Sequence, residues 1–248
     1  MKPEKRGVLE SAAVAAGFAA LTIGYSLAAV PAVLVDPDRG APRMARRWAK
    51  RCLGLAGVDV EIDAPPDLGP GPYVVMANHT SHFDVVALYG HLPIGVRFVA
   101  KKELSYIPVF GWVLALGAAI IIDRKNHEAA VRSLDKAGQA VAAGASVLLF
   151  PEGTRTPPGH LGDLKKGPFH LALAARVPVL PVGIEGSGDV LAKGDWHIRR
   201  GHIRIRIGTP IPTTGYPEGE AGRAALMADV AKALEGLGHL QKDAAQAP

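Results

Sequence analysis

The stretch YVVMANHTSHFDVVALYGHLPIGVRFVAK, from Tyr73 to Lys101, indicates the fold more clearly than any other part of the chain. Residues 73–77 form an apolar run typical of a buried strand, residues 83–92 have the apolar spacing of a helix, and residues 96–101 again resemble a strand. A strand, a helix and a second strand in succession are typical of a parallel βαβ unit, in which helices cover the sheet.

The same alternation continues toward the C-terminus. Further strands are expected at residues 118–123, 146–151, 178–186 and 202–208, and further helices at residues 107–117, 127–144 and 224–238. We therefore predict an α/β fold, a single domain with a mostly parallel mixed sheet flanked by helices. Functional groups in such folds lie in loops beyond the C-terminal ends of strands, so residues 78–84, 123–126 and 151–166 should lie at one end of the sheet.

The front of the chain differs in character, because residues 11–35 carry no charge. About 20 apolar residues suffice to cross a bilayer as a helix. We predict a hydrophobic membrane helix within residues 1–38, which either spans the bilayer or dips into one leaflet. A cleaved signal peptide and a buried soluble helix are the alternatives. Glu10 and Pro31 disfavour the signal peptide, since they interrupt its apolar region and its small-residue cleavage pattern.

Basic residues follow this segment in greater number than they precede it. The positive-inside rule then places the rest of the chain in the cytoplasm, which predicts the cytoplasmic (inner) membrane with the catalytic domain facing the cytoplasm. Arg43, Arg47 and Lys50 share one face of a predicted helix at residues 39–57, which we expect to lie on anionic headgroups. The main domain is expected at residues 58–238, and a flexible tail at residues 239–248.

The overall composition limits the classes of partner. The chain has 248 residues and a formal net charge of +5, and 48% of its residues are hydrophobic, so a large core can form. Aromatic residues are few and show no basic-aromatic interleaving, which makes nucleic acid the least favoured anionic partner. The single cysteine, Cys52, has no metal or redox motif near it and is expected to be buried or neutral.

His79 and Asp84 follow the strand at residues 73–77 and are five positions apart. Their side chains can meet only if the chain turns between them, and a strand-to-helix loop permits such a turn. A carboxylate that accepts from one imidazole nitrogen leaves the other nitrogen as a base. No G-x-S-x-G serine motif is present, so the nucleophile could be the substrate's own hydroxyl. A metal site that includes His82 lacks a second ligand cluster, and no metal is predicted; a histidine pair without chemistry is the remaining alternative.

Two further polar stretches follow predicted strands. FPEGTRT, residues 150–156, brings Glu152, Gly153, Thr154 and Arg155 into one turn, and a buried charge there must be paired or used. GAAIIIDRKN, residues 117–126, ends its apolar run at Asp123 and Arg124, and arginine suits phosphate. Taken alone, this second signal is no stronger than the charges that commonly end strands.

The order and spacing of these blocks resemble the glycerolipid acyltransferase family, and within it the bacterial 1-acyl-glycerol-3-phosphate acyltransferases. N-H-T-S-H-F-D, then GAAIIIDR, FPEGTRT and VPVLPVGI follow one another between Tyr73 and Glu185. The His-x4-Asp block is a weak signature by itself, but together with Phe-Pro-Glu-Gly-Thr-Arg it is a strong one. Thr156 stands where the family often has serine, and the resemblance gives His82 no role.

The resemblance implies that a fatty acyl group passes from acyl-CoA or acyl-carrier protein to the sn-2 hydroxyl of a lysophospholipid acceptor, 1-acyl-glycerol-3-phosphate, giving phosphatidic acid in phospholipid biosynthesis. It implies His79 as the catalytic base and Asp84 as its orienting partner, without an acyl-enzyme or a cofactor. Arg124, Glu152, Gly153, Thr154 and Arg155, with Lys101, would bind the substrate. Another lyso-lipid acceptor, such as a lyso-aminolipid, a membrane-bound thioesterase or hydrolase, and a lipid-binding scaffold are the alternatives.

Overall fold

A computed structural model describes residues 6–36, 39–123 and 127–242. Seven strands form one sheet in the order β1-β8-β7-β2-β5-β3-β4. Their bounds are β1 Val58–Asp63, β2 Val74–Ala77, β3 Val96–Lys101, β4 Ala119–Ile122, β5 Ser146–Leu149, β7 Val179–Glu185 and β8 Gly201–Ile207. Every pair is parallel except β7–β8, which confirms the predicted α/β fold with a mostly parallel, mixed sheet.

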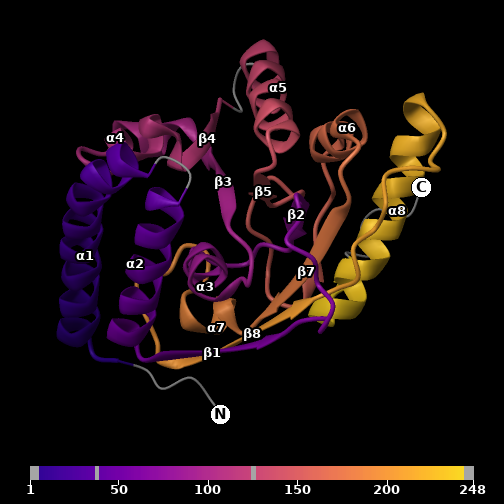
Figure 1. Cartoon of the computed structure of the whole chain (residues 1–248). Helices are drawn as coiled ribbons and strands as arrows, with labels where there is room; N and C mark the ends of the chain where they lie inside the picture. Colours follow the sequence, from indigo (N-terminus) through magenta and orange to yellow (C-terminus); the bar gives the residue numbers. More distant parts are fainter. Residues whose placement is uncertain (1–5, 37–38, 124–126, 243–248) are drawn as a thin grey trace.

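Helices cover both faces of this sheet, as Figure 1 shows. One face carries α2 (Gly40–Ala56), α3 (Phe83–His91) and the short α7 (Ser187–Val190), and α1 (Val8–Val35) packs outside α2. The other face carries α5 (His127–Ala142), α6 (Lys166–Ala175) and α8 (Gly219–Gly238). The two coverings explain why β2, at the centre, has no exposed residue.

The side chains of β2 alternate between two cores, one on each side of the sheet. Val75 and Ala77 belong to the core formed with α2 and α3, whereas Val74 and Met76 belong to the core formed with α5, α6 and α8. Cys52 of α2 is fully buried in the first core, and burial raises the pKa of its thiol to about 12. This agrees with the prediction that Cys52 is buried or neutral.

Several elements differ from the expectations. β1 was not predicted, although its sequence VDVEID alternates apolar and acidic residues; it pairs with β8 at the edge of the sheet. α6, which follows the loop expected at residues 151–166, was not predicted either. The helix expected at residues 107–117 begins three residues later and consists of two contiguous helical pieces, α4 (Phe110–Val113) and η2 (Leu114–Ala118), which follow a separate short turn, η1 (Lys102–Tyr106). Val109, directly before α4, has a φ of +66°, so the chain is not helical at that residue.

The predicted flexible tail also begins later than expected. β9 (Gln241–Lys242) pairs with β6 (His160–Leu161), and the Gln241 amide donates to the Gly159 carbonyl at 2.8 Å. Leu240 is buried against the core, and this apolar contact holds the chain that follows α8. The boundary at residue 239 was therefore wrong, and residues 243–248 lie outside the described residues.

α1 is the only helix among the described residues that is long and apolar enough to cross a membrane by length and composition. It corresponds to the predicted hydrophobic helix, and α2 corresponds to the predicted basic helix. Only 17% of the apolar window of α1 is buried inside the protein. Most of its apolar surface therefore faces outward and remains available to lipid.

Candidate active site

The turn after β2 is fixed to the neighbouring strand β7 by a buried asparagine. The Asn78 side-chain amide donates to the Ile184 carbonyl at 2.9 Å and accepts from the Ile184 amide at 2.7 Å. The Thr80 and Ser187 hydroxyls form a further buried contact at 2.8 Å. These bonds connect the turn to β7 and α7, so the residues between them have a defined geometry.

His79 and Asp84 meet across this turn. His79 Nδ1 lies 2.7 Å from Asp84 Oδ2, and the same oxygen accepts from the Thr80 and Ser81 amides at 2.8 and 2.9 Å. Because a carboxylate only accepts hydrogen bonds, we assign the ring proton to Nδ1. His79 Nε2 then carries the free lone pair, and the His79 side chain retains 15% exposure. This geometry is that of a base and its orienting partner.

Two neighbours hold the His79 ring and the turn in place. The ring stacks on Phe150 with centroids 3.9 Å apart and an interplanar angle of 5°. Phe150 directly follows β5, which pairs with β2, so the FPEGTRT block lies beside the histidine; the two loops lie at the same end of the sheet, as predicted. The Thr156 amide donates to the His79 carbonyl at 2.8 Å. Both contacts join residues more than 70 positions apart.

Glu152 has a different environment from the one predicted. It is 2% exposed; its Oε1 accepts from the His79 amide at 2.7 Å and its Oε2 from the Gly162 amide at 2.8 Å. Among the described residues, Glu152 forms no ion pair with Arg155, so the partners that its buried charge was expected to need are backbone amides. Burial raises the pKa of Glu152, and the bonds from Gly162, Thr156 and His79 oppose that rise. The sequence indicated that this charge needed a partner, but not that backbone amides supply it.

The other predicted binding residues surround the dyad to different extents. Gly153 has a φ of +72°, a conformation that glycine adopts without steric cost. Thr154 is exposed and Arg155 is half-buried in the same turn. Lys101 ends β3 and pairs with Glu103 at 3.1 Å, with half of its side chain exposed. Arg124 lies outside the described residues, so its predicted role stays a prediction.

His82 lies between His79 and Asp84 in the sequence, but no hydrogen bond joins it to either of them among the described residues. It lines an apolar pocket rather than contacting Asp84 through a hydrogen bond. Burial, with the charges of Arg155 and His79 nearby, lowers the pKa of His82 below its ordinary value of 6.5. Within the described residues, no group of three or more histidine, cysteine, aspartate or glutamate side chains could hold a metal ion.

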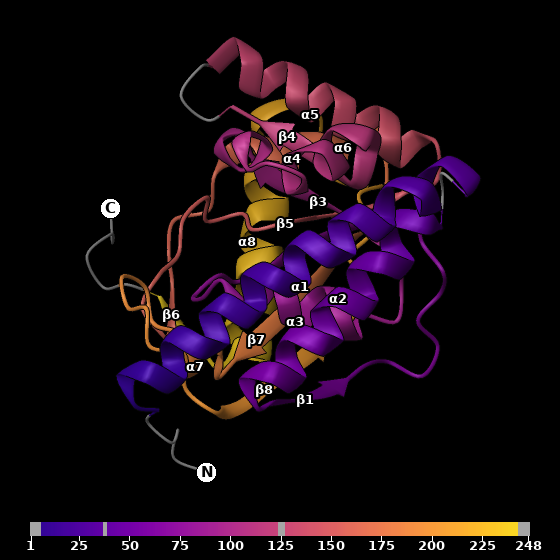
Figure 2. The same ribbon diagram turned by 90° about the vertical axis from the view of Figure 1, so that its left-hand side faces the viewer.

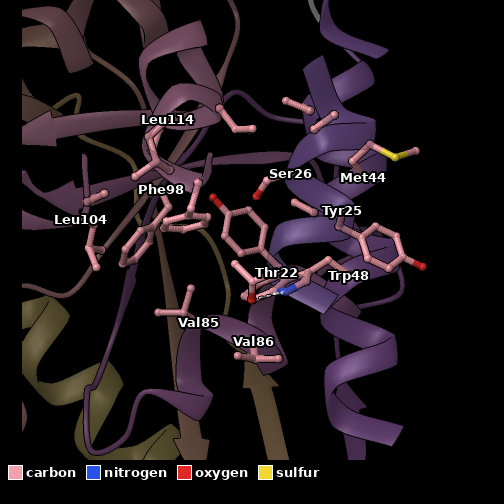
Figure 3. A pocket seen from close by; sticks show the side chains of 18 of the residues that line it. Thr22, Tyr25, Ser26, Met44, Trp48, Val85, Val86, Phe98, Leu104 and Leu114 are labelled. Carbon is pink, nitrogen blue, oxygen red and sulfur yellow. Dashed lines mark hydrogen bonds between the residues drawn. The ribbon is translucent and has the colours of Figure 1, made fainter. Parts of the chain in front are cut away.

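That apolar pocket has a volume of about 310 Å³ and lies between the N-terminal helices and the sheet. Figure 3 shows Phe98, Leu104 and Leu114 on one side of it, and Thr22 and Ser26 of α1 on the other. The Trp48 indole of α2 donates to the Thr22 hydroxyl at 3.1 Å. The Thr22 hydroxyl in the pocket wall therefore already has a hydrogen-bond partner. A lipid acyl chain in the pocket would contact mainly carbon atoms. The sequence did not predict this pocket, because its walls come from five separate segments.

Comparison with known proteins gives concordant results. The sequence model of the Acyltransferase family matches residues 59–185. The chain is 36% identical over 186 residues to a Pseudomonas aeruginosa protein named 1-acyl-sn-glycerol-3-phosphate acyltransferase, covering 73% of this chain and 70% of that one. It is 32% identical over 194 residues to a Saccharomyces cerevisiae protein of the same name, covering 75% of this chain and 64% of the yeast protein.

A solved structure resembles nearly the whole chain. It is the crystal structure of the 1-acyl-sn-glycerophosphate acyltransferase from Thermotoga maritima, with a TM-score of 0.74 and 26% sequence identity. The superposition covers 97% of this chain and 98% of that one. The likeness therefore includes α1 and α2, which lie outside the matched family region.

Proposed function

This chain belongs to the acyltransferase family, and we propose on that premise that it transfers a fatty acyl group to the sn-2 hydroxyl of 1-acyl-glycerol-3-phosphate, giving phosphatidic acid. The observation that carries the proposal is the 2.7 Å contact between His79 and the buried Asp84, which leaves His79 Nε2 as a base. The names of the relatives supply the acceptor, and the apolar pocket beside His82 fits a lipid chain.

The reaction needs no acyl-enzyme. His79 Nε2 takes the proton from the acceptor hydroxyl, and the oxygen attacks the thioester carbonyl of the donor. The carbon–sulfur bond then breaks, and the thiolate that leaves takes the proton back from His79. Asp84 stabilises the transient imidazolium, and the Thr80 and Ser81 amides hold Asp84 in place. We propose acyl-CoA or acyl-carrier protein as the donor, and no cofactor, because a thioester is already activated.

The phosphate of the acceptor requires cationic partners near His79. Arg155 is the best placed of the described residues, because it is half-buried in the turn beside His79 and its charge acts on neighbouring His82. Lys101 ends a strand on the same edge of the sheet, and Arg124 comes two residues after β4 in the sequence. We propose these three as phosphate ligands and Gly153 and Thr154 as further contacts, while Glu152 organises the turn instead of binding the substrate.

The pocket of about 310 Å³ is proposed to hold an acyl chain of one substrate. His82, three residues after His79, is one of the residues that line it. Most of the other lining residues are apolar, including Phe18 of α1 and Val86 of α3, although Thr22, Ser26 and Arg97 also line it. A chain in the pocket would therefore leave its carbonyl or glycerol end near the base.

We propose that α1 lies in one leaflet instead of crossing the bilayer. Glu10, near its start, pairs with Arg200 at 3.3 Å; Thr22 accepts from Trp48; and Ala32, near its end, packs against Gly40. A helix that is held by the domain at its start, by α2 in its middle and at its end, and by α4 cannot leave these contacts to span a membrane. The basic residues of α2 favour the cytoplasmic face of the inner membrane, where anionic headgroups attract them.

The test is acyl transfer by the purified protein in detergent. With labelled acyl-CoA and 1-acyl-glycerol-3-phosphate, labelled phosphatidic acid should form, and His79→Ala should lower kcat by about 10²–10⁴-fold or more, the usual contribution of a positioned base. Asp84→Asn should also lower kcat with little change in KM. Circular dichroism of each variant controls for folding.

The other outcomes distinguish the alternatives. Release of free fatty acid without an acceptor would indicate a hydrolase. Transfer to a lyso-aminolipid in preference to the phosphate-bearing acceptor would reject the proposed substrate and the role of Arg155. Full activity of His79→Ala would reject the mechanism.

A further inference from the structure

The large apolar side chains that are exposed are concentrated in two places. Within the described part of the chain, all of them except Leu55 and Trp196 belong either to α1 or to residues 106–116. The second group consists of Tyr106, Ile107, Trp112 and Leu116, which are 67, 45, 59 and 44% exposed. Four such side chains within 11 residues form an apolar surface that a protein in water rarely maintains without a partner.

This 106–116 segment is compactly folded. Val113 and Leu114 are buried beneath it, whereas Trp112 and Leu116, four positions apart, share the outward side. Gly111 packs so closely that an added Cβ would lie 2.1 Å from the Ser105 carbonyl oxygen. The segment is thus apolar on two sides: Val113 and Leu114 pack into the protein, and Trp112 and Leu116 face outward.

The segment adjoins α1. α4 contacts α1 directly, and Figures 1 and 2 both place α4 beside α1 on the outer side of the molecule. Figure 2 views this side face-on, with α1 and α4 in front of the sheet. The apolar pocket lies between them, since Phe18 and Tyr25 of α1 and Phe110 and Val113 of the segment all line it.

A lipid leaflet fits this surface better than a second copy of the chain. Arg47 and Lys50 are exposed on α2, which packs against α1, and Lys101 and Lys102, which pair with Glu103 and Asp123, come four to five residues before the segment. Paired copies would bring these charges together, whereas a membrane offers anionic headgroups to the charges and acyl chains to the apolar side chains. Exposed tyrosine and tryptophan are typical of the boundary between the two.

We propose that residues 106–116 form a second membrane-inserted element, which together with α1 seats the mouth of the pocket in the leaflet. The inference rests on the proposed function, because the membrane that this segment would enter is the one that contains the lipid acceptor. An acyl chain can then pass sideways from the leaflet, between α1 and α4, toward His79 without crossing water.

The direct test uses Trp112 as a depth probe. Trp48→Phe and Trp196→Phe leave Trp112 as the only tryptophan, since the chain has three. Vesicles of phosphatidylcholine and phosphatidylglycerol with bromine near the headgroup end of the acyl chains should quench Trp112 fluorescence and shift it to the blue. Vesicles of the same composition without bromine are the control. Unquenched, unshifted fluorescence from vesicle-bound protein would overturn the inference.

A second test separates the surface from the chemistry. Trp112→Ser combined with Leu116→Ser should weaken partition into these vesicles roughly tenfold, because two half-exposed large side chains lose their transfer to lipid. Acyl transfer to an acceptor embedded in vesicles should fall to a similar extent, while transfer to a short-chain acceptor dissolved as monomers should stay unchanged. Ala115→Ser, also exposed in this segment, is the matched control.

The outcomes are distinguishable from those of the proposed function. If the unmodified protein transfers no acyl group in either format, the proposed function fails, yet the quenching result still decides the membrane contact. If the double variant partitions normally, the inference fails although the enzyme is active. If the double variant instead converts a dimer into a monomer with unchanged partition, the surface binds a second copy and the inference is rejected.

Discussion

At the scale of single residues, the base and its partner form a largely local arrangement. Asp84 Oδ2 accepts hydrogen bonds from His79 Nδ1 and from the backbone amides of Thr80 and Ser81. All four residues lie within the six-residue stretch that begins at His79. The position of that stretch relative to the rest of the site, however, depends on Glu152, which bonds the His79 amide from 73 positions away. The contact between the base and its partner therefore depends on residues that are close in sequence. The position of this pair in the site depends on residues that are distant in sequence.

Glu152→Gln tests this placement. A glutamine side chain offers one acceptor oxygen where the glutamate offers two, so either the His79 or the Gly162 amide would face an amide donor. An unsatisfied buried donor costs about 1–3 kcal/mol, and the free energy of unfolding should fall by that amount. We expect kcat to fall with little change in KM, because the base moves while the substrate contacts remain.

Glu218→Gln is the control for this change. Glu218 is exposed, and although it is the N-cap residue of α8, its side chain forms no capping hydrogen bond. Chemical denaturation and steady-state kinetics are the measurements. An increase in KM with unchanged kcat would instead assign Glu152 to substrate binding.

The same carboxyl group should make stability depend on pH. Burial raises the pKa of Glu152 above 4.5, so the folded state keeps its proton at pH values where the unfolded chain has released it. Its contribution to the free energy of unfolding is therefore largest at low pH, falls as pH rises from about 4.5 through the raised pKa, and is constant above it. The difference between the wild-type and Glu152→Gln denaturation curves, measured from pH 4 to 8, should show this fall; a difference that rises with pH would contradict it.

At the scale of secondary-structure elements, the close approach of α1 and α2 depends on glycine. A Cβ added to Gly40 would lie 2.2 Å from the Ala32 carbonyl oxygen, so α1 and α2 would have to separate. Gly40→Ala should lower the free energy of unfolding by about 1–3 kcal/mol, the usual cost of overpacking, and should also weaken vesicle binding. Thermal unfolding and vesicle sedimentation are the measurements.

Gly54 in the same helix provides a matched comparison. An added Cβ there meets no atom within 4 Å, so Gly54→Ala should stabilise the protein by up to about 1 kcal/mol through helix propensity. If the two substitutions changed the free energy of unfolding equally, the close contact between α1 and α2 would not determine the stability of the protein.

The elements predicted correctly were those with a strong local pattern. The apolar run of β2, the helical spacing of α3 and the glycine that follows α5 were sufficient to infer a parallel sheet, and the parallel strands correctly placed FPEGTRT at the same end of the sheet as His79. Three features were not predictable in this way. β1 is a half-exposed edge strand with a weak signal, the amide partners of Glu152 are far away in sequence, and the 106–116 segment has two apolar sides that periodicity cannot separate.

At the scale of the whole molecule, the pocket joins the N-terminal helices to the sheet, so its length should determine which acyl chains are accepted. Ala29 of α1 is 3% exposed and lines the pocket. Ala29→Leu should shorten the space, and kcat/KM should fall for long-chain substrates while values for short chains stay close to those of the wild type.

Ala28→Leu is the control for this substitution, because Ala28 is the adjacent residue and is exposed on the outer side of α1. Assays with a series of donor and acceptor chain lengths would also show which substrate occupies the pocket. A uniform loss for all chain lengths would indicate general damage to the fold instead.

The ion pair between Glu10 and Arg200 has a consequence for how the protein is made. The two residues are 190 positions apart, and β1 likewise pairs with β8 near the other end of the chain. At a synthesis rate of about 5–20 residues per second, Glu10 is made roughly 10–40 s before Arg200. During that time α1 has α2 to pack against but not the completed domain, so we expect the nascent chain to reach the membrane first and the catalytic sheet to assemble there.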